Sequence, residues 1–166
     1  PELQTALNKE LTEHSGTYAH PKLIGDEGRA QLAKGRAVYA DQCLACHGES
    51  GEGDGPAADY LYPRPRDYRK GLFKFTSTPY GAKPLRSDLE RTIRAGVRGT
   101  SMPSFHLLPE DEINAVIDYV MMLTHRGEFE EGLANQAEAE DVIDSAAVKE
   151  EVLPLVTQRW TQAETE

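Results

Sequence analysis

The chain has 166 residues, 39% of them hydrophobic, and a net charge of −10 at pH 7. This length suits one domain with extensions around a small core, and no apolar run of about 18 residues predicts a membrane-spanning helix. The acidity is concentrated at one end, because residues 127–166 hold eleven Asp and Glu against two basic residues. Residues 64–98, by contrast, hold ten Lys and Arg against three acidic residues. An acidic chain without a recognition motif argues against nucleic-acid binding.

The first third of the chain predicts an arm followed by a helix. Residues 1–27 are polar and lack a sustained period, so we expect an arm with one short helix. From residue 28 to 42 a helical pattern follows, carried by Leu32, Gly35, Tyr39 and Cys43. Glycine costs roughly 1 kcal/mol in a helix relative to alanine, so Gly35 predicts that another helix crosses closely there.

The remainder predicts a long loop and further helices. Residues 48–86 are rich in Gly and Pro, and a loop of this length in a compact domain suggests that a buried cofactor organises it. A capping-box pattern at residues 87–90 predicts a second helix, and residues 109–124 predict a third with a wide apolar face. An i+4 row within residues 148–160 predicts that part of the acidic tail is helical. No strand pattern is convincing, so the predicted fold is all-α.

Both cysteines lie in one motif, Cys43-Leu-Ala-Cys46-His47. A structural zinc site needs a second Cys or His pair, and a thioredoxin-like redox pair lies beside a βαβ pattern; the sequence shows neither. A disulfide closing so short a loop would restrain the unfolded chain little. The favoured interpretation is covalent attachment of haem, in which two thiols add to the porphyrin vinyl groups and the adjacent histidine binds the iron.

An iron bound by His47 needs a ligand on its other face. The candidates are the other histidines and the methionines: His14, His20, His106, His125, Met102, Met121 and Met122. Met121 and Met122 fall inside the predicted last helix, which favours a core role. Met102 lies in a glycine-flanked loop before a proline that stiffens the backbone, so Met102 is the preferred ligand and His106 its chief competitor. We expect the other three histidines to face solvent or to cap helices.

Together these features resemble class I c-type cytochromes over residues 28–125. The matching segments are the helix with Gly35 and Tyr39, the Cys43–His47 motif, Gly55-Pro56, the GTSMPSF segment at 99–105 and the Leu-Pro-initiated last helix. The resemblance implies three main helices around one covalent haem, with an N-terminal arm and a partly helical acidic C-terminal extension. It divides the chain into an arm (1–27), a cytochrome c domain (28–126) and an acidic extension or linker (127–166).

The resemblance also implies roles around the haem. In this family the first and last helices cross, which here places Gly35 and Tyr39 against the turn at 117–120. The carbonyl of the proline that Pro56 matches accepts a hydrogen bond from the proximal imidazole. Among the donors of residues 64–74 we expect one or two arginines to bind the haem propionates, with Arg66 as the candidate, and we expect Phe75 to pack against the haem.

The predicted function is electron transfer by one haem c cycling between Fe(II) and Fe(III), with His47 and Met102 as axial ligands and no bond chemistry of its own. One alternative is an electron-transfer domain or subunit of a larger redox enzyme, and a second is an open-site haem sensor or peroxidase-like protein. We expect redox protein partners of a respiratory chain to dock by electrostatics on the basic region 64–98, unless the acidic tail folds back over it. The family implies a periplasmic or otherwise exported protein, associated with a membrane through a partner or a segment outside this sequence.

Overall fold

A computed structural model describes residues 1–25 and 31–165, and within these ranges it contains helices and loops but no strand. The elements in chain order are α1 (Glu2–Ser15), α2 (Leu32–Gln42), α3 (Leu44–His47), a 3-10 turn η1 (Ala58–Tyr60), α4 (Arg86–Ala95), α5 (Glu110–Glu140), α6 (Ser145–Ala147), a π-turn η2 (Val148–Val152) and α7 (Leu153–Ala163). The expected all-α fold is therefore confirmed. The expected boundary between residues 27 and 28, and residue 166, lie outside the described residues.

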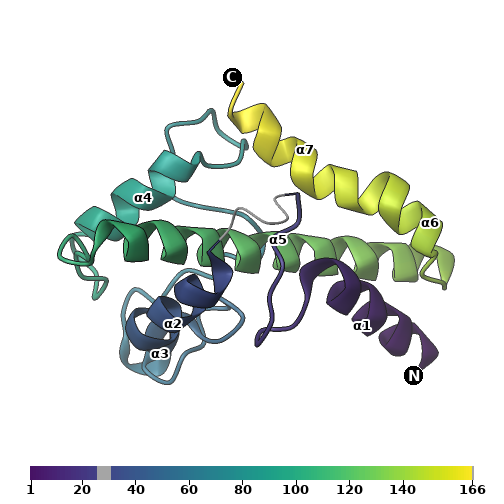
Figure 1. Ribbon diagram of the computed structural model, residues 1–166, viewed down its shortest axis with the longest axis horizontal. Coiled ribbons are helices and arrows are strands. Elements are labelled where there is room, and N and C mark those ends of the chain that lie inside the picture. The colour runs from purple at the N-terminus through teal and green to yellow at the C-terminus, as the bar shows by residue number, and fades with distance from the viewer. Residues whose placement is uncertain (26–30, 166) are drawn as a thin grey trace.

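Helix α5 runs along the long axis of the molecule, and α1, α2, α4 and α7 pack against it (Figure 1). The first half of α5 is flanked by α2 and α3 on one side and by α4 on the other, whereas α1, α6 and α7 flank its second half. One helix thus carries two groups of partners, and the predicted cytochrome helices make up the first group.

The crossing of α2 and α5 depends on a glycine, as the sequence predicted. A Cβ atom on Gly35 would lie 2.1 Å from the carbonyl oxygen of Ala115 and 2.9 Å from Cβ of Tyr119. Next to this point the rings of Tyr39 and Tyr119 pack with centroids 5.0 Å apart. Both tyrosines are almost completely buried. The absence of a side chain at Gly35 therefore permits the close backbone approach around which the first core is built.

A second core covers the other half of α5. Its buried members come from α1, α5 and the C-terminal helices: Leu11, Ile24, Phe129, Leu133, Val148, Val152 and Val156. Burial of a side chain of this size contributes about 1.5–3 kcal/mol each. The predicted helical row in the acidic tail is confirmed, and its apolar side is the part of the tail that packs on α5 and α1.

The predicted end of the last helix is wrong, because α5 continues through Gly127 to Glu140. Gly127 looks like a helix stop in the sequence, but a Cβ atom there would lie 2.4 Å from the carbonyl oxygen of Arg69. The glycine therefore makes room for a crossing loop. The helix ends at Asp141, which adopts a left-handed conformation at φ 57° and donates its N–H to the carbonyl of Ala137 at 3.0 Å.

The predicted capping box of α4 is shifted by two residues. The helix begins at Arg86, and the backbone N–H of Leu85, not of Ser87, donates to the carboxylate of Asp88 at 3.0 Å. That carboxylate also accepts from the backbone of Ser77 at 3.0 Å, and its residue is buried. Asp88 therefore fixes both the start of α4 and the loop before it.

A buried carboxylate joins the two halves of the molecule. Glu128 on α5 forms an ion pair with Lys83 from the long loop, and both side chains are less than one-tenth exposed. The other oxygen of Glu128 accepts from the indole Nε1 of Trp160 on α7 at 3.0 Å. Lys83 also donates to the backbone carbonyls of residues 70 and 71, each at 3.3 Å. The loop, α5 and α7 consequently meet at one side chain.

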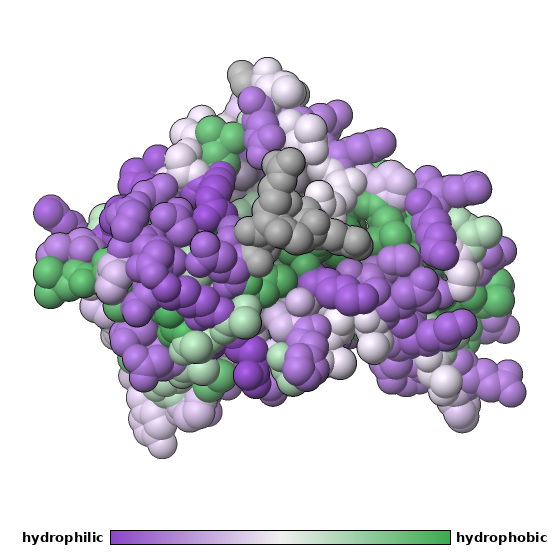
Figure 2. Space-filling model, in the orientation of Figure 1, coloured by the Kyte–Doolittle hydropathy of each residue, from purple (hydrophilic) through white to green (hydrophobic). Residues whose placement is uncertain are grey.

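No helix in the described part of the chain is both long enough and apolar enough to cross a membrane. In the view of Figure 2, hydrophilic side chains cover most of the surface over α4, and hydrophobic side chains show between α1 and α7.

Candidate haem site

The Cys-x-x-Cys-His motif forms a single helical turn at the end of α2. The N–H of Cys43 donates to the carbonyl of Tyr39 at 2.9 Å, and the N–H of His47 donates to the carbonyl of Cys43 at 2.9 Å. This turn holds both thiols and the imidazole at the wall of one cavity. Burial raises the pKa of the Cys43 thiol to about 12, with the neighbouring Cys46 as a further cause, so this thiol stays protonated in its apolar surroundings.

The imidazole of His47 has one nitrogen fixed by the backbone. Its Nδ1 lies 3.1 Å from the carbonyl oxygen of Arg66. A carbonyl can only accept, so Nδ1 carries the proton and Nε2 keeps its lone pair. Burial lowers the pKa of His47, which favours the neutral ring. The sequence-predicted metal ligand is therefore in the protonation state that binds a metal ion.

The hydrogen bond that the resemblance assigned to the carbonyl of Pro56 is made by Arg66. Pro56 is exposed and does not line the cavity. Its segment folds back on α3 instead, where Gly55 donates to the carbonyl of Cys46 at 3.2 Å. A Cβ atom on Gly55 would lie 2.3 Å from the carbonyl oxygen of Ala45. Gly55-Pro56 therefore packs against α3, and the loop segment that contains Arg66 supplies the acceptor for Nδ1 of His47.

A buried, hydrogen-bonded pair of tyrosines lies on the core side of His47. The ring of Tyr68 lies 5.0 Å from the imidazole, and its hydroxyl donates to the hydroxyl of Tyr39 at 2.7 Å. Tyr39 in turn donates to the carbonyl of Gly48 at 2.7 Å, directly after the motif. Burial raises the pKa of both phenols. Tyr68 belongs to the segment 64–74 in which propionate donors are expected, but the structure buries it in the core, where it packs against the motif.

The cavity beside the motif has a volume of about 600 Å³. Apolar side chains from α2, α4, α5 and the long loop form much of its wall: Val38, Phe73, Leu89, Ile93, Val116 and Val120. The long loop 48–86 therefore forms part of the cavity wall, consistent with the interpretation that a buried cofactor organises it. Phe75 also lines the cavity and remains 47% exposed, which places it at the rim.

Met102 lines the same cavity as His47. Its loop is fixed by its own hydrogen bonds, since Met102 accepts from the N–H of Val97 at 3.2 Å and donates to the hydroxyl of Thr100 at 3.1 Å. A Cβ atom on Gly96 would lie 2.6 Å from the backbone of Pro103, so the loop folds tightly on itself. The structure thus brings together the two side chains that the sequence named as axial ligands.

The competing ligand candidates do not line the cavity. His106 is exposed, with Nδ1 2.6 Å from the hydroxyl of Ser104. Met122 is a buried core residue and Met121 packs against the core, as expected from the helix pattern. The expectation for His14 and His125 is wrong. His14 packs edge-on against Phe129 with its Nε2 buried, and His125 is 5% exposed with its ring packed against Trp160 at 4.7 Å. Continuation of α5 past Gly127 and the docking of α7 bury His125.

Several cationic side chains from the predicted basic region stand at the cavity. Arg66, Lys70 and Lys74 line it and form no ion pair with any described residue. Most of the other basic residues of this region pair locally, as Arg64 does with Asp59 at 2.7 Å. Among the described residues no ion pair joins the acidic tail to these three cations, and the tail meets the basic region through Glu128, which pairs with Lys83. The helix α7 packs on α5.

The cavity fits a haem by the chemistry of its residues. It offers two thiols one helical turn apart, a neutral imidazole with a free nitrogen and a thioether, within walls that are mainly apolar and beside three cations suited to propionates. Fold and site together define a c-type cytochrome.

Comparisons with known proteins give the family. Residues 30–120 match the family described as cytochrome c oxidase, cbb3-type, subunit III, and the chain belongs to this family. A segment of 45 residues is 38% identical to a thiosulfate dehydrogenase of Stutzerimonas stutzeri, covering 27% of this chain and 15% of that protein. The chain is also similar to a solved structure titled as a reducing HAO-like protein complex of Kuenenia stuttgartiensis. That match has 36% identity and a TM-score of 0.52, over 55% of this chain and 41% of the other.

The family implies haem c as the cofactor and electron transfer as the function. The chain spans 15% of that thiosulfate dehydrogenase and 41% of that solved chain.

Proposed function

We propose that this protein transfers single electrons through one haem bound covalently by Cys43 and Cys46, with His47 and Met102 as the axial ligands. The observation that carries the proposal is that all four side chains line one cavity of about 600 Å³. When bound, the haem supplies an iron that takes up and releases one electron, and a thioether opposite an imidazole favours its reduced state. With both axial positions held by protein side chains, no position is left for a substrate, so the chain performs no bond chemistry itself.

The residues of the chain have distinct tasks in this proposal. The Arg66 carbonyl keeps the Nδ1 proton of His47 in place and thereby presents Nε2 to the metal. The apolar wall excludes water. The Arg66 side chain and the two lysines beside it bind the propionates, and Phe75 covers the exposed edge. The same cations give an acidic redox partner a place to dock near the haem edge.

Both matched proteins carry redox names, a thiosulfate dehydrogenase and a reducing HAO-like complex. Because this chain spans less than half of each, we propose that it serves as an electron-transfer domain or subunit that works with a larger redox enzyme. Haem attachment of this type takes place outside the bacterial cytoplasm, so we place the protein in the periplasm or an equivalent exported compartment.

The test of the covalent part of this proposal is the mass of the intact chain. Holoprotein is denatured in acidified organic solvent, which extracts haem that is not covalently held, and is compared with Cys43→Ala, Cys46→Ala and the double variant. We expect the wild-type chain to keep the mass of one haem, each single variant to keep one thioether bond and the double variant to lose all haem. A wild-type chain whose haem is fully extracted would contradict the proposal.

A further inference from the structure

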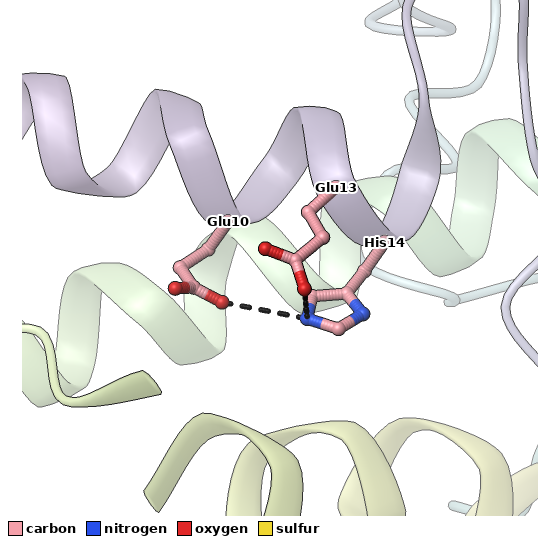
Figure 3. Close-up of side chains that lie close together, drawn as sticks. All are labelled: Glu10, Glu13 and His14. Atoms are coloured by element: carbon pink, nitrogen blue, oxygen red, sulfur yellow. Dashed lines mark ion pairs between the residues drawn. The ribbon is translucent and has the colours of Figure 1, made fainter. Parts of the chain in front are cut away.

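Helix α1 carries a cluster of metal-binding side chains far from the haem cavity. Glu10, Glu13 and His14 project from one side of the helix toward one another (Figure 3), as the i, i+3 and i+4 spacing requires. One carboxylate oxygen of each glutamate and one imidazole nitrogen all lie within 4.8 Å of one another. None of the three residues lines the haem cavity.

Two atoms of this cluster are buried without a hydrogen-bond partner. Glu10 is 2% exposed, and its Oε1 accepts from the hydroxyl of Ser145 on α6. Its Oε2 and the Nε2 of His14 are both buried, and neither has a hydrogen-bond partner among residues 1–25 and 31–165. These two atoms lie 3.4 Å apart and form an ion pair when the imidazole is protonated (Figure 3). With a neutral imidazole they need another partner, because an unpaired buried polar group is costly.

The spacing of these atoms matches a metal ion. Nε2 of His14 lies 3.4 Å from Oε2 of Glu10 and 3.9 Å from Oε1 of Glu13. Bonds of about 2.1 Å to a tetrahedral ion separate two ligand atoms by about 3.4 Å. Glu13 has a side chain that is 47% exposed, so a small rotation closes its longer distance.

We propose that Glu10, Glu13 and His14 bind a divalent transition-metal ion, for which Zn²⁺ is the probe. An imidazole with two carboxylates is a ligand set for this class of ion, whereas Mg²⁺ and Ca²⁺ prefer oxygen ligands alone. Three protein ligands leave a coordination position for water.

The surroundings of the cluster support the ligand geometry. Ser145 fixes one oxygen of Glu10 and leaves the other toward His14, and the imidazole packs edge-on against Phe129 of α5 at 5.8 Å. The ammonium of Lys149 lies 3.7 Å from Glu13 and is more than half exposed, so an ion can displace it into solvent. Since Glu10 is tied to α6 and His14 packs on α5, a bound ion stabilises the attachment of α1 to the second core.

The experiment uses the holoprotein after dialysis against a chelator, titrated with Zn²⁺ in a calorimeter and melted with and without Zn²⁺. We expect one ion per chain, and a rise in the melting temperature of about 5–10 °C at a hundredfold excess over the dissociation constant. His14→Ala should weaken binding at least tenfold, and Glu13→Gln, whose side chain is half exposed and tolerates substitution, should do the same. The exposed His20 provides the control, and His20→Ala should bind as wild type does.

Absence of saturable Zn²⁺ binding to wild type would overturn the proposal, as would binding that His14→Ala leaves unchanged. The absorption spectrum of the haem reports that each variant is folded. Binding by His14→Ala that equals binding by His20→Ala would assign the zinc to adventitious surface ligands.

Discussion

The hydroxyl of Tyr68 donates a 2.7 Å hydrogen bond to the hydroxyl of Tyr39, and this buried pair connects the long loop to the helix that ends in the haem motif. The hydroxyl of Tyr39 in turn donates a hydrogen bond to the carbonyl of Gly48. The two phenols are therefore not equivalent. Tyr39 both accepts and donates, whereas Tyr68 only donates within this chain of hydrogen bonds.

This asymmetry predicts the effects of removing each hydroxyl. Tyr39→Phe leaves the Tyr68 hydroxyl without its acceptor and the Gly48 carbonyl without its donor, so we expect a loss of about 2–3 kcal/mol in the free energy of unfolding. Tyr68→Phe leaves Tyr39 bonded to Gly48 and should cost about 1 kcal/mol. Denaturant unfolding of the holoproteins measures both. A larger loss for Tyr68→Phe than for Tyr39→Phe would show that the hydrogen bonds run in another direction.

The second prediction concerns the helix crossing. Gly35→Ala places a Cβ atom 2.1 Å from the carbonyl of Ala115, so the helices must separate and the chain should lose about 1–3 kcal/mol of stability. The sign is diagnostic, because the same change in a free helix position stabilises by about 1 kcal/mol. Ala37→Gly at an exposed position of α2 is the control for propensity alone and should cost about 1 kcal/mol. A Gly35→Ala variant as stable as wild type would argue against the close crossing.

The third prediction is a pH dependence from His125. Burial lowers the pKa of this residue to about 4, and the nearby charge of Lys83 acts in the same direction. Between pH 6.5 and pH 4 the unfolded chain binds a proton on His125 that the folded chain does not bind. The folded state should therefore lose stability as the pH falls through this window, by about 2 kcal/mol between pH 7 and pH 5 from this residue.

His125→Leu should remove that part of the pH dependence, whatever it does to stability at pH 7. The control is His20→Gln, at an exposed position, which should keep the wild-type slope. Both slopes come from denaturant unfolding at pH 5, 6 and 7. An unchanged slope in His125→Leu would mean that the folded protein takes up the proton as readily as the unfolded chain.

The fourth prediction concerns the buried ion pair of Lys83 and Glu128. Lys83→Met leaves the Glu128 carboxylate buried without its cation and should cost about 3–5 kcal/mol, whereas Lys83→Met with Glu128→Gln should recover part of that loss. Lys34 and Asp111 form an ion pair whose side chains are 41% and 58% exposed, so Lys34→Met should cost less than about 1 kcal/mol. Equal losses for the two single lysine variants, measured by thermal unfolding, would contradict the burial of the first pair.

The sequence predicted those features whose signal is carried by side-chain type and spacing. The Cys43–His47 motif, the crossing at Gly35 and the helical row of the tail all follow from a residue type at a defined position, and the structure has each of them. Met102 is the preferred ligand in the sequence because it lies in a glycine-flanked loop before a proline and not inside a helix. Of Met102 and its competitor His106, only Met102 lines the cavity.

Other features leave no local signal. The group that accepts the hydrogen bond from Nδ1 of His47 is a backbone carbonyl. Every residue has one, so residue type cannot distinguish Arg66 from Pro56 as the acceptor. A glycine at position 127 is typical of a helix C-terminus, but here it makes room for the backbone of Arg69. That contact joins segments distant in the sequence, so the local pattern does not reveal it. The buried Phe129 and Leu133 lie among Glu128, Glu130 and Glu131, so the composition of this segment indicates an exposed tail and not a core.

The measurement that tests the central claim most directly is the absorption spectrum of the holoprotein, oxidised and reduced, with carbon monoxide added to the reduced form. It is recorded for wild type, for Met102→Ala and for Met121→Ala as a matched control outside the cavity wall. The account predicts that wild type and Met121→Ala are low-spin and do not bind carbon monoxide, and that Met102→Ala does. Carbon monoxide binding by the wild-type protein would contradict the closed His47–Met102 site and favour a sensor or a catalyst.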